Sequence, residues 1–257
     1  MANEKPCLQA QITIDSTNKW LDVDSSENGV FAVDVAEGTY DDIHALLVAI
    51  DNALENVIEV EDFTVTVSDE GIVTITCTSG DTIKILGETG THGLNNDDDH
   101  INHIIGHDDV DDVSYAASQA GGYQHMYGWY PDKWPASFGP WNPKAIGGEQ
   151  RDTLSGSNSK KLHAAFHHFY DVEYTRLPPE YVYSAEATGS DLNKDLEHVW
   201  EQLAQSKVGR WFEDASDSGT YTEIYLKSPF DWTGVVTRPH RDYKAYNIKM
   251  RFREKEP

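Results

Sequence analysis

The chain contains little sulfur and no long hydrophobic run. Only two of its 257 residues are cysteines, Cys7 and Cys77, which are too few for a disulfide framework or a four-thiolate zinc site. Cys77 alternates with Thr74 and Thr76 as a small buried residue would, so redox chemistry is not expected. No apolar run approaches the roughly 18 residues that cross a bilayer, and the start lacks a secretory signal pattern. We therefore expect a soluble protein with no membrane partner.

Positive charge is scarce, and the scarcity is regional. The formal net charge is -24, yet residues 1–115 alone hold 25 acidic residues against three lysines. The remaining 142 residues hold 19 acidic and 17 basic residues and are nearly neutral. A uniformly acidic chain would indicate adaptation to high salt, whereas this asymmetry favours a local role or a strongly solvated face. DNA binding through phosphates is disfavoured for the first half, because it depends on Lys and Arg displacing condensed counterions.

The last 20 residues reverse this balance. Their basic residues are Arg238, Arg241, Lys244, Lys249, Arg251, Arg253 and Lys255, set against Asp242, Glu254 and Glu256. Such a segment could form a basic edge that meets an acidic neighbour, and we take Arg251 and Arg253 as candidate subunit contacts. The alternative is a strand whose charged face lies in water.

Alternation and helical spacing predict a small sheet with one covering helix in the first half. Residues 11–15 and 30–35 are typical of short, half-buried strands. Apolar residues then recur at i, i+3, i+4, i+7 and i+11 from Ile43 to Leu54, which predicts a helix ending near Asn56. Asp51 and Glu55 are expected to turn outward from this helix.

Three further strands are expected after the helix. Residues 63–67 and 73–77 alternate on either side of a turn at 68–71, which predicts a hairpin. A second turn at 79–81 leads to a strand at 83–85, so we expect a three-stranded meander. The segment 87–112 is rich in Gly, Asn, Asp and His, with one short helical patch at 101–105.

The second half predicts mainly strands and one helix. Strands are expected over 162–172, 181–187, 211–212, 221–226 and 246–252, the last with one wet face. Asp191 is the expected cap of a helix whose apolar stripe runs from Leu192 to Leu203 and which stops near Gly209. The fold class is therefore α+β: an N-terminal small sheet with one covering helix, then a mainly β domain carrying one helix. We expect an acidic domain with an aromatic connector in residues 1–145 and a mainly β domain in 146–257.

Three histidines form the strongest candidate metal site. His100, His103 and His107 lie at i, i+3 and i+7, so one helix face could present all three imidazoles among neighbouring aspartates. The pattern lacks the Glu of a His-Glu-x-x-His helix, and no EF-hand register fits it. A polar loop with solvated histidines explains the segment more simply. We expect no metal, with this trio as the weak candidate.

Other catalytic motifs are missing from the sequence. The glycines at 87, 90 and 93 match neither a phosphate loop nor a dinucleotide fold, and the chain contains no Gly-x-Ser-x-Gly elbow. His163, His167 and His168 are interleaved with phenylalanines, which favours packing over ligation. We expect no enzymatic activity and no cofactor.

Aromatic residues cluster between Tyr123 and Trp141. Such rings wedge between elements or pack against a neighbouring subunit, and our candidate interface rings are Trp129, Tyr130, Trp134 and Trp141. An exposed platform for sugars is the alternative reading of the same rings.

Several segments, taken in order, resemble virion structural proteins of tailed bacteriophages. In the first half these are residues 30–40 with the following helix, the 63–77 hairpin, Ile104-Ile105-Gly106-His107 with 108–118, and Tyr127-Gly128-Trp129-Tyr130-Pro131. In the second half they are 199–203 running on to Gly209-Arg210-Trp211-Phe212, and the closing 243–253 strand. The sequence departs from that pattern at His107, where a bulky aromatic residue often follows the glycine, and in the insert before it.

The resemblance implies a non-enzymatic subunit of the tail, or of the neck that joins tail and capsid. It would reside in the virion as a homo-oligomeric ring or stack that contacts other virion proteins. DNA would pass nearby without specific binding, because an acidic lining repels phosphates. We expect part of the acidic first half to face that channel or open solvent, and the second half to make subunit contacts. The alternatives are a tail-tip module binding host glycans through Trp129, Trp134 and Trp141, or a metal-dependent hydrolase using the three histidines.

Overall fold

The computed structural model describes most of the chain. The described residues are 5–57, 62–131, 135, 137–140, 144–145, 148–152, 158–162, 166–167, 169–182, 193–206, 208–215, 217–226, 231–236 and 244–254. Within these ranges, residues 137–170, 231–236, 244 and 254 are described by their backbone alone. The expected α+β class is confirmed, because strands predominate and the described part holds three α-helices.

The elements follow one another in short segments. The strands up to residue 129 are β1 Cys7–Ala10, β2 Ile12–Ile14, β3 Trp20–Ser25, β4 Gly29–Asp34, β5 Gly38–Tyr40, β6 Phe63–Val67, β7 Val73–Cys77, β8 Ile83–Ile85, β9 Ser118–Ala120 and β10 Gly128–Trp129. The later strands are β11 Ser137–Pro140, β12 Lys144–Ala145, β13 Gly148–Asp152, β14 Asn158–Leu162, β15 Phe166–His167, β16 Phe169–Leu177, β17 Val208–Phe212, β18 Tyr221–Leu226, β19 Asp231–Val236 and β20 Lys244–Glu254. The helices are α1 Ile43–Val57, α2 Asn102–Ile105 and α3 Leu196–Ser206, with a 3-10 turn at Pro179–Tyr181.

The chain divides into two compact units, and each is interrupted in sequence. Unit 1 comprises Met1–Trp134 and Pro178–Thr222, whereas unit 2 comprises Pro135–Leu177 and Glu223–Pro257. The predicted division into 1–145 and 146–257 is therefore corrected. Its cause is long-range pairing: β17 lies next to β1, with Leu8 opposite Trp211, so the middle of the second half belongs with the N-terminus.

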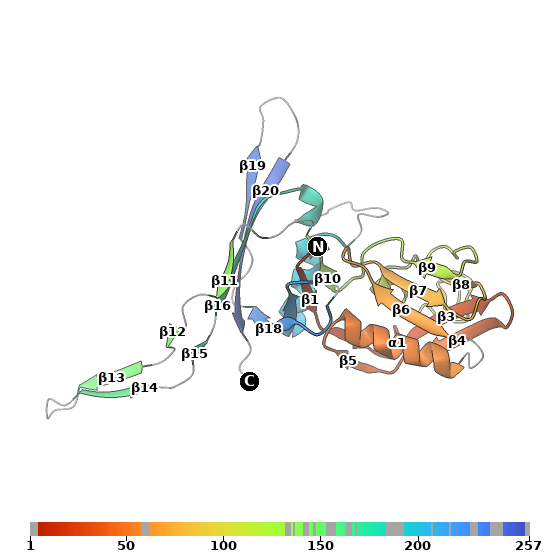
Figure 1. Cartoon of the computed structure of the whole chain (residues 1–257), viewed down its shortest axis with the longest axis horizontal. Helices are drawn as coiled ribbons and strands as arrows, with labels where there is room; N and C mark the ends of the chain where they lie inside the picture. Colours follow the sequence, from red (N-terminus) through yellow and green to blue (C-terminus); the bar gives the residue numbers. More distant parts are fainter. Residues whose placement is uncertain are drawn as a thin grey trace. The chain divides into compact units, whose positions relative to one another are not determined.

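The core of unit 1 forms around α1. Ile43, Leu46, Leu47, Ile50 and Leu54 are buried, as the spacing predicted, and α1 packs against β6 and β4 (Figure 1). The strands belong to two three-stranded sheets, with orders β6-β7-β9 and β4-β3-β8. Their inward side chains join those of α1 in one hydrophobic cluster.

The hairpin is confirmed, but the meander is wrong. β6 and β7 pair in the expected register, with Val65 opposite Ile75. β8 does not continue that sheet; it pairs with β3, placing Ile85 opposite Val23, and β9 takes the place beside β7. Alternation identifies a strand and its buried face, and it contains no information about which edge the strand joins.

In addition to the antiparallel pair of β2 and β5, unit 1 contains a third group of strands around β1. β1 is buried along its whole length and pairs with β10 on one side and β17 on the other. α3 packs against β1 and starts at Leu196, later than predicted. Its cap is Asp195, whose Oδ1 accepts a hydrogen bond from the His198 N–H at 2.9 Å. The predicted cap, Asp191, lies outside the described residues.

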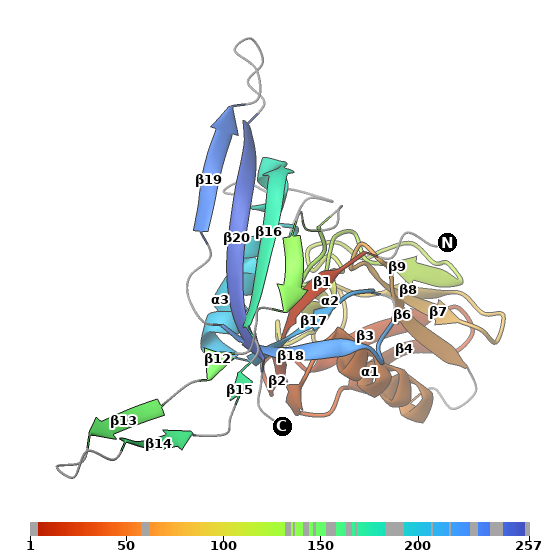
Figure 2. The ribbon, with the colours of Figure 1, turned by 60° about the vertical axis from the view of Figure 1, so that its left-hand side comes forward.

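Unit 2 is built around two long strands (Figure 2). β16 pairs with β11 and β20, and β20 also pairs with β19 and β18. Ile248, Met250 and Phe252 are buried while Lys249 and Arg251 are exposed, so the predicted wet face of the last strand is confirmed. Tyr181 belongs to the 3-10 turn, and residues 183–187 of the strand expected there lie outside the described residues. No helix in the described ranges is long and apolar enough to cross a membrane.

Candidate functional site

The three candidate metal ligands do not converge. α2 spans only four residues, and Gly106 follows it in the left-handed region with φ 81°, which breaks the expected i, i+3, i+7 register before His107. The His100 and His103 rings lie edge to face with centroids 6.3 Å apart. Across the described ranges, no group of three or more His, Cys, Asp or Glu side chains is arranged to hold a metal ion.

His107 is a core residue. Its side chain is buried, and neither ring nitrogen has a hydrogen-bond partner. Burial lowers the pKa of His107 to about 4, which keeps the imidazole neutral near pH 7. Its carbonyl accepts a 2.7 Å hydrogen bond from the Tyr123 hydroxyl. This buried position is therefore filled by an uncharged ring.

Two of the candidate interface rings also lie inside unit 1. Trp129 is 0 % exposed and donates a 2.8 Å hydrogen bond from Nε1 to the Tyr181 carbonyl. Tyr130 is 3 % exposed. Neither ring offers surface to a sugar or a neighbouring subunit in this fold, which corrects their assignment as interface residues and favours core packing. Trp134 and Trp141 lie outside the described residues.

Tyr130 belongs to a buried polar network that sequence reasoning missed. Its hydroxyl accepts from Gln9 Nε2 at 3.1 Å and lies 2.6 Å from His125 Nε2. Gln9 Oε1 accepts the Ile43 backbone N–H at 3.0 Å, so the network also reaches the start of α1. Burial lowers the pKa of His125 to about 3 and raises that of the Cys7 thiol, so both groups stay neutral. The network therefore has a structural role: its hydrogen bonds hold β1, the Tyr130 region and the start of α1 together.

The guanidinium of Arg210, on β17, holds the N-terminus of α1. Arg210 forms ion pairs with Asp42 and, at 2.8 Å, with Asp41 Oδ2, and its guanidinium lies over the Tyr221 ring at 3.9 Å. Asp42 is buried and also caps α1, because Oδ1 accepts the Ala45 N–H at 2.9 Å.

The two candidate basic contacts remain at the surface of unit 2. Arg251 forms a two-pronged pair with Asp171, with Nε to Oδ1 at 2.6 Å and Nη2 to Oδ2 at 2.8 Å. Arg253 lies over the Tyr225 ring, 5.3 Å from its centroid. Their role as subunit contacts stays a prediction.

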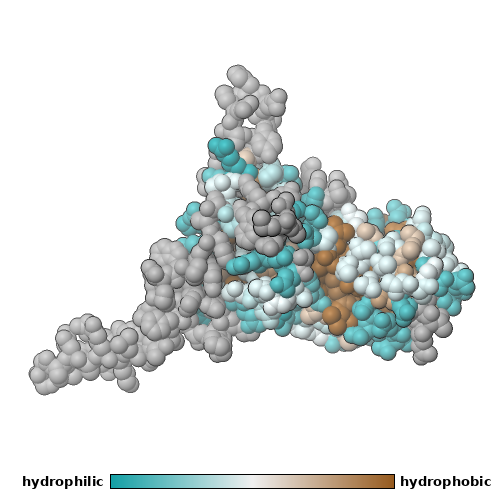
Figure 3. Space-filling view, viewed as in Figure 1, coloured by the Kyte–Doolittle hydropathy of each residue, from teal (hydrophilic) through white to brown (hydrophobic). Residues whose placement is uncertain are grey.

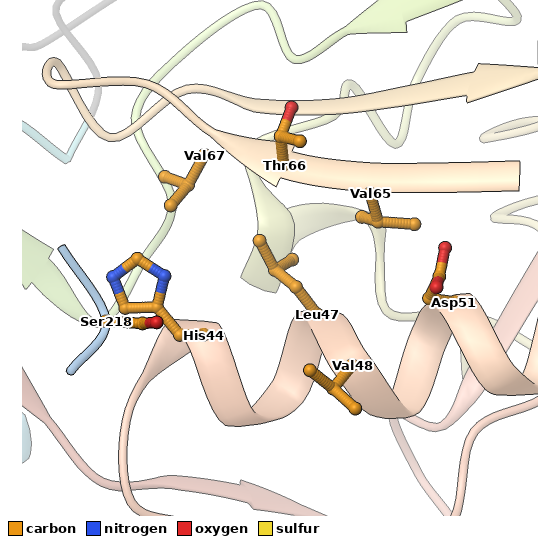
Figure 4. Close-up of a pocket in the computed structure, with 8 residues that line it drawn as sticks. All are labelled: His44, Leu47, Val48, Asp51, Val65, Thr66, Val67 and Ser218. Carbon is orange, nitrogen blue, oxygen red and sulfur yellow. The ribbon is translucent and has the colours of Figure 1, made fainter. Parts of the chain in front are cut away.

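A pocket of about 270 Å³ opens between α1 and β6 (Figure 4). His44, Leu47, Val48 and Asp51 line it from one face of the helix, at i, i+3, i+4 and i+7. Val65, Thr66 and Val67 line it from the strand, and Ser218 completes it. Asp51 was predicted to face outward, yet its Oδ1 is buried here, while Glu55 is exposed as expected. The helical spacing alone places Asp51 and His44 on one face, but only the position of β6 turns that face into a pocket.

No family model, curated protein or solved structure gives a match to this chain.

Proposed function

We propose that the chain is a non-enzymatic structural subunit of a tailed phage, built as a homo-oligomer into the tail or the neck that joins tail and capsid. It would work within the virion beside other virion proteins and bind no cofactor. The observation that carries the proposal is the pair of isolated two-stranded ribbons in unit 2, β13–β14 and β12–β15.

These ribbons have no third strand in the described part of the chain. β13 and β14 pair over five residues, from Gly148 opposite Leu162 to Asp152 opposite Asn158. A lone two-stranded ribbon is at best marginally stable in water and needs a further strand or packing surface. A neighbouring subunit would supply that surface, which is the reason to expect an assembly.

The charge of the first half fits a surface that DNA passes without binding. All three lysines of residues 1–115 are already engaged: Lys5 with Glu70 at 2.8 Å, Lys19 with Asp34 at 3.2 Å, and Lys84 with Asp24 at 3.6 Å. The excess carboxylates therefore set the sign of the local potential, which repels phosphates. This supports a place near the DNA path, with the channel or open solvent facing the acidic surface.

The mass of the full chain in solution tests the proposal. We expect sedimentation velocity to give a multiple of the 28.8 kDa chain mass. A variant that replaces residues 148–162 by a short Gly/Ser linker should shift toward the monomer. Its helical circular dichroism signal should stay unchanged, because the described α-helices all lie in unit 1. The control replaces only residues 153–157 and keeps both strands, so it should assemble normally. A monomer at every concentration, or absence of the chain from purified particles of the phage that encodes it, would contradict the proposal.

The alternatives gain no support from the described residues. Trp129 is buried in the core, so it cannot stack on a glycan. The three histidines do not share one helix face, as the hydrolase would require, because α2 ends before His107.

A further inference from the structure

The pocket between α1 and β6 contains two buried polar atoms without a hydrogen-bond partner. They are Asp51 Oδ1 and His44 Nε2, and both side chains line the pocket (Figure 4). A buried acceptor that lacks a donor costs free energy, because it gives up its hydrogen bond to water and gains none in return. A ligand that brings donors to both atoms would recover that loss.

His44 acts as an acceptor at Nε2. Burial lowers the pKa of His44, while Asp42, a backbone hydrogen bond with Ala215 and Asp217 act in the opposite direction with smaller effect. The ring is therefore neutral near pH 7, with one nitrogen that donates and one that accepts. Since Ala215 engages the ring and Nε2 is unpaired, Nε2 carries the free lone pair.

The two acceptors lie at opposite ends of an apolar wall. Seven residues separate them on α1, a spacing of about 10 Å along a helix axis. Leu47 and Val48 lie between them on the helix, and Val65 and Val67 face them from β6. Val48 is 62 % exposed, and Figure 3 shows hydrophobic surface on this side of unit 1. The matching ligand has a donor at each end and an apolar middle.

The charge of the pocket selects a cation. Asp51 supplies a carboxylate oxygen to the lining. The sequence that contains α1 and β6 is acidic, with 25 Asp and Glu residues against three lysines over residues 1–115. We infer that this pocket binds an alkylammonium group, with the ammonium donating to Asp51, the methylene chain against Leu47 and Val67, and a second N–H donating to His44 Nε2. A free diamine and a lysine residue of a protein segment share this chemistry. The inference is independent of the proposed phage function.

Titration of the full-length protein with small amines tests the site. We use diaminopentane, pentylamine and pentanediol as probes and follow the chemical shifts of the His44 ring and the Val65 and Val67 methyl groups. We expect the diamine to bind more tightly than the monoamine, and the uncharged diol not to bind. Asp51→Asn should weaken amine binding about tenfold or more, because it removes a charge-assisted hydrogen bond. Glu55→Gln, which removes an exposed charge from the same helix, should leave binding unchanged.

A second comparison identifies the source of the group. Lysine blocked at both backbone ends should bind more tightly than diaminopentane if a protein segment is the natural occupant, and more weakly if a free diamine is. Lysine acetylated on its side chain should fail in either case. Absence of binding by every amine, or equal weakening by Asp51→Asn and Glu55→Gln, would overturn the inference.

Discussion

The two most deeply buried histidines of unit 1 tie its stability to pH. Burial lowers the pKa of His107 to about 4 and that of His125 to about 3, whereas an unfolded chain restores a value near 6.5. Between about pH 6.5 and 4 the unfolded state binds more protons than the folded state, so stability is lost as pH falls through this window. Above the window both states are neutral and the contribution is fully present.

We expect His107→Leu to flatten this pH dependence. Each such histidine costs up to about 1.4 kcal/mol per pH unit within the window, and the variant lacks one of them. Urea unfolding at pH 7, 6 and 5 measures the slope. Ile105→Val is the matched control, because it disturbs the same core without a titrating group and should shift stability equally at each pH. An unchanged slope in the His107 variant would show that the ring has the same pKa in the folded protein as in the unfolded chain.

Side-chain environments were the least predictable feature at the residue scale. Aromatic rings among prolines and glycines are found both at subunit interfaces and in cores. The sequence could not distinguish the two environments, and the prediction placed Trp129 and Tyr130 at an interface. Their buried partners come from far away, since Gln9 lies 121 residues before Tyr130. Asp51 was misplaced for a similar reason: helical spacing defines its face, and β6 decides whether water reaches it.

At the scale of elements, α1 is fixed by contacts at its first turn. Asp42 caps the helix, Gln9 accepts the Ile43 N–H, and Arg210 bridges Asp41 and Asp42 from β17. The side chain of Asp42 is only 2 % exposed, so loss of its cation would leave a carboxylate unpaired in the core.

Arg210→Ala should therefore lower the free energy of unfolding by about 1–3 kcal/mol, a range reduced because Asp41 is half exposed. Urea unfolding gives the value. Lys249→Ala serves as the comparison, since it removes a surface pair with Glu173 in which both side chains are largely exposed, and we expect no measurable loss. Equal effects of the two substitutions would mean that Arg210 contributes no more than a surface charge.

Local patterns predicted elements but not their neighbours. The stripe from Ile43 to Leu54 and the alternation of β6 and β7 are local signals, and both elements formed as expected. The partner of β8 and the return of β17 to β1 depend on pairings between distant segments, which hydrophobic alternation does not encode. The cap of α3 is Asp195, and the sequence alone could not distinguish between the two acidic residues near the start of this helix.

Across the whole molecule, the dominant feature is a formal net charge of -24. Carboxylates that repel one another favour the expanded, unfolded chain, and dissolved salt screens that repulsion. We expect the thermal midpoint of unfolding to rise as ionic strength increases from about 0.01 M to about 0.1 M, when the screening length falls from about 30 Å to about 10 Å. Sodium chloride and choline chloride should act alike if screening is the cause. A fall in the midpoint would mean that ion pairs outweigh the repulsion.

The return of β17 to β1 sets an order of events during synthesis. β1 emerges from the ribosome before both of its partner strands and gains β10 as a neighbour once residue 129 is available. Its second edge stays open until residues 208–212 have been translated, after the whole first stretch of unit 2. An open edge of a strand as apolar as Cys7–Ala10 invites pairing with other nascent chains. A truncated product that ends before β17 would therefore be prone to aggregation, and the cell must protect this strand until β17 has been translated.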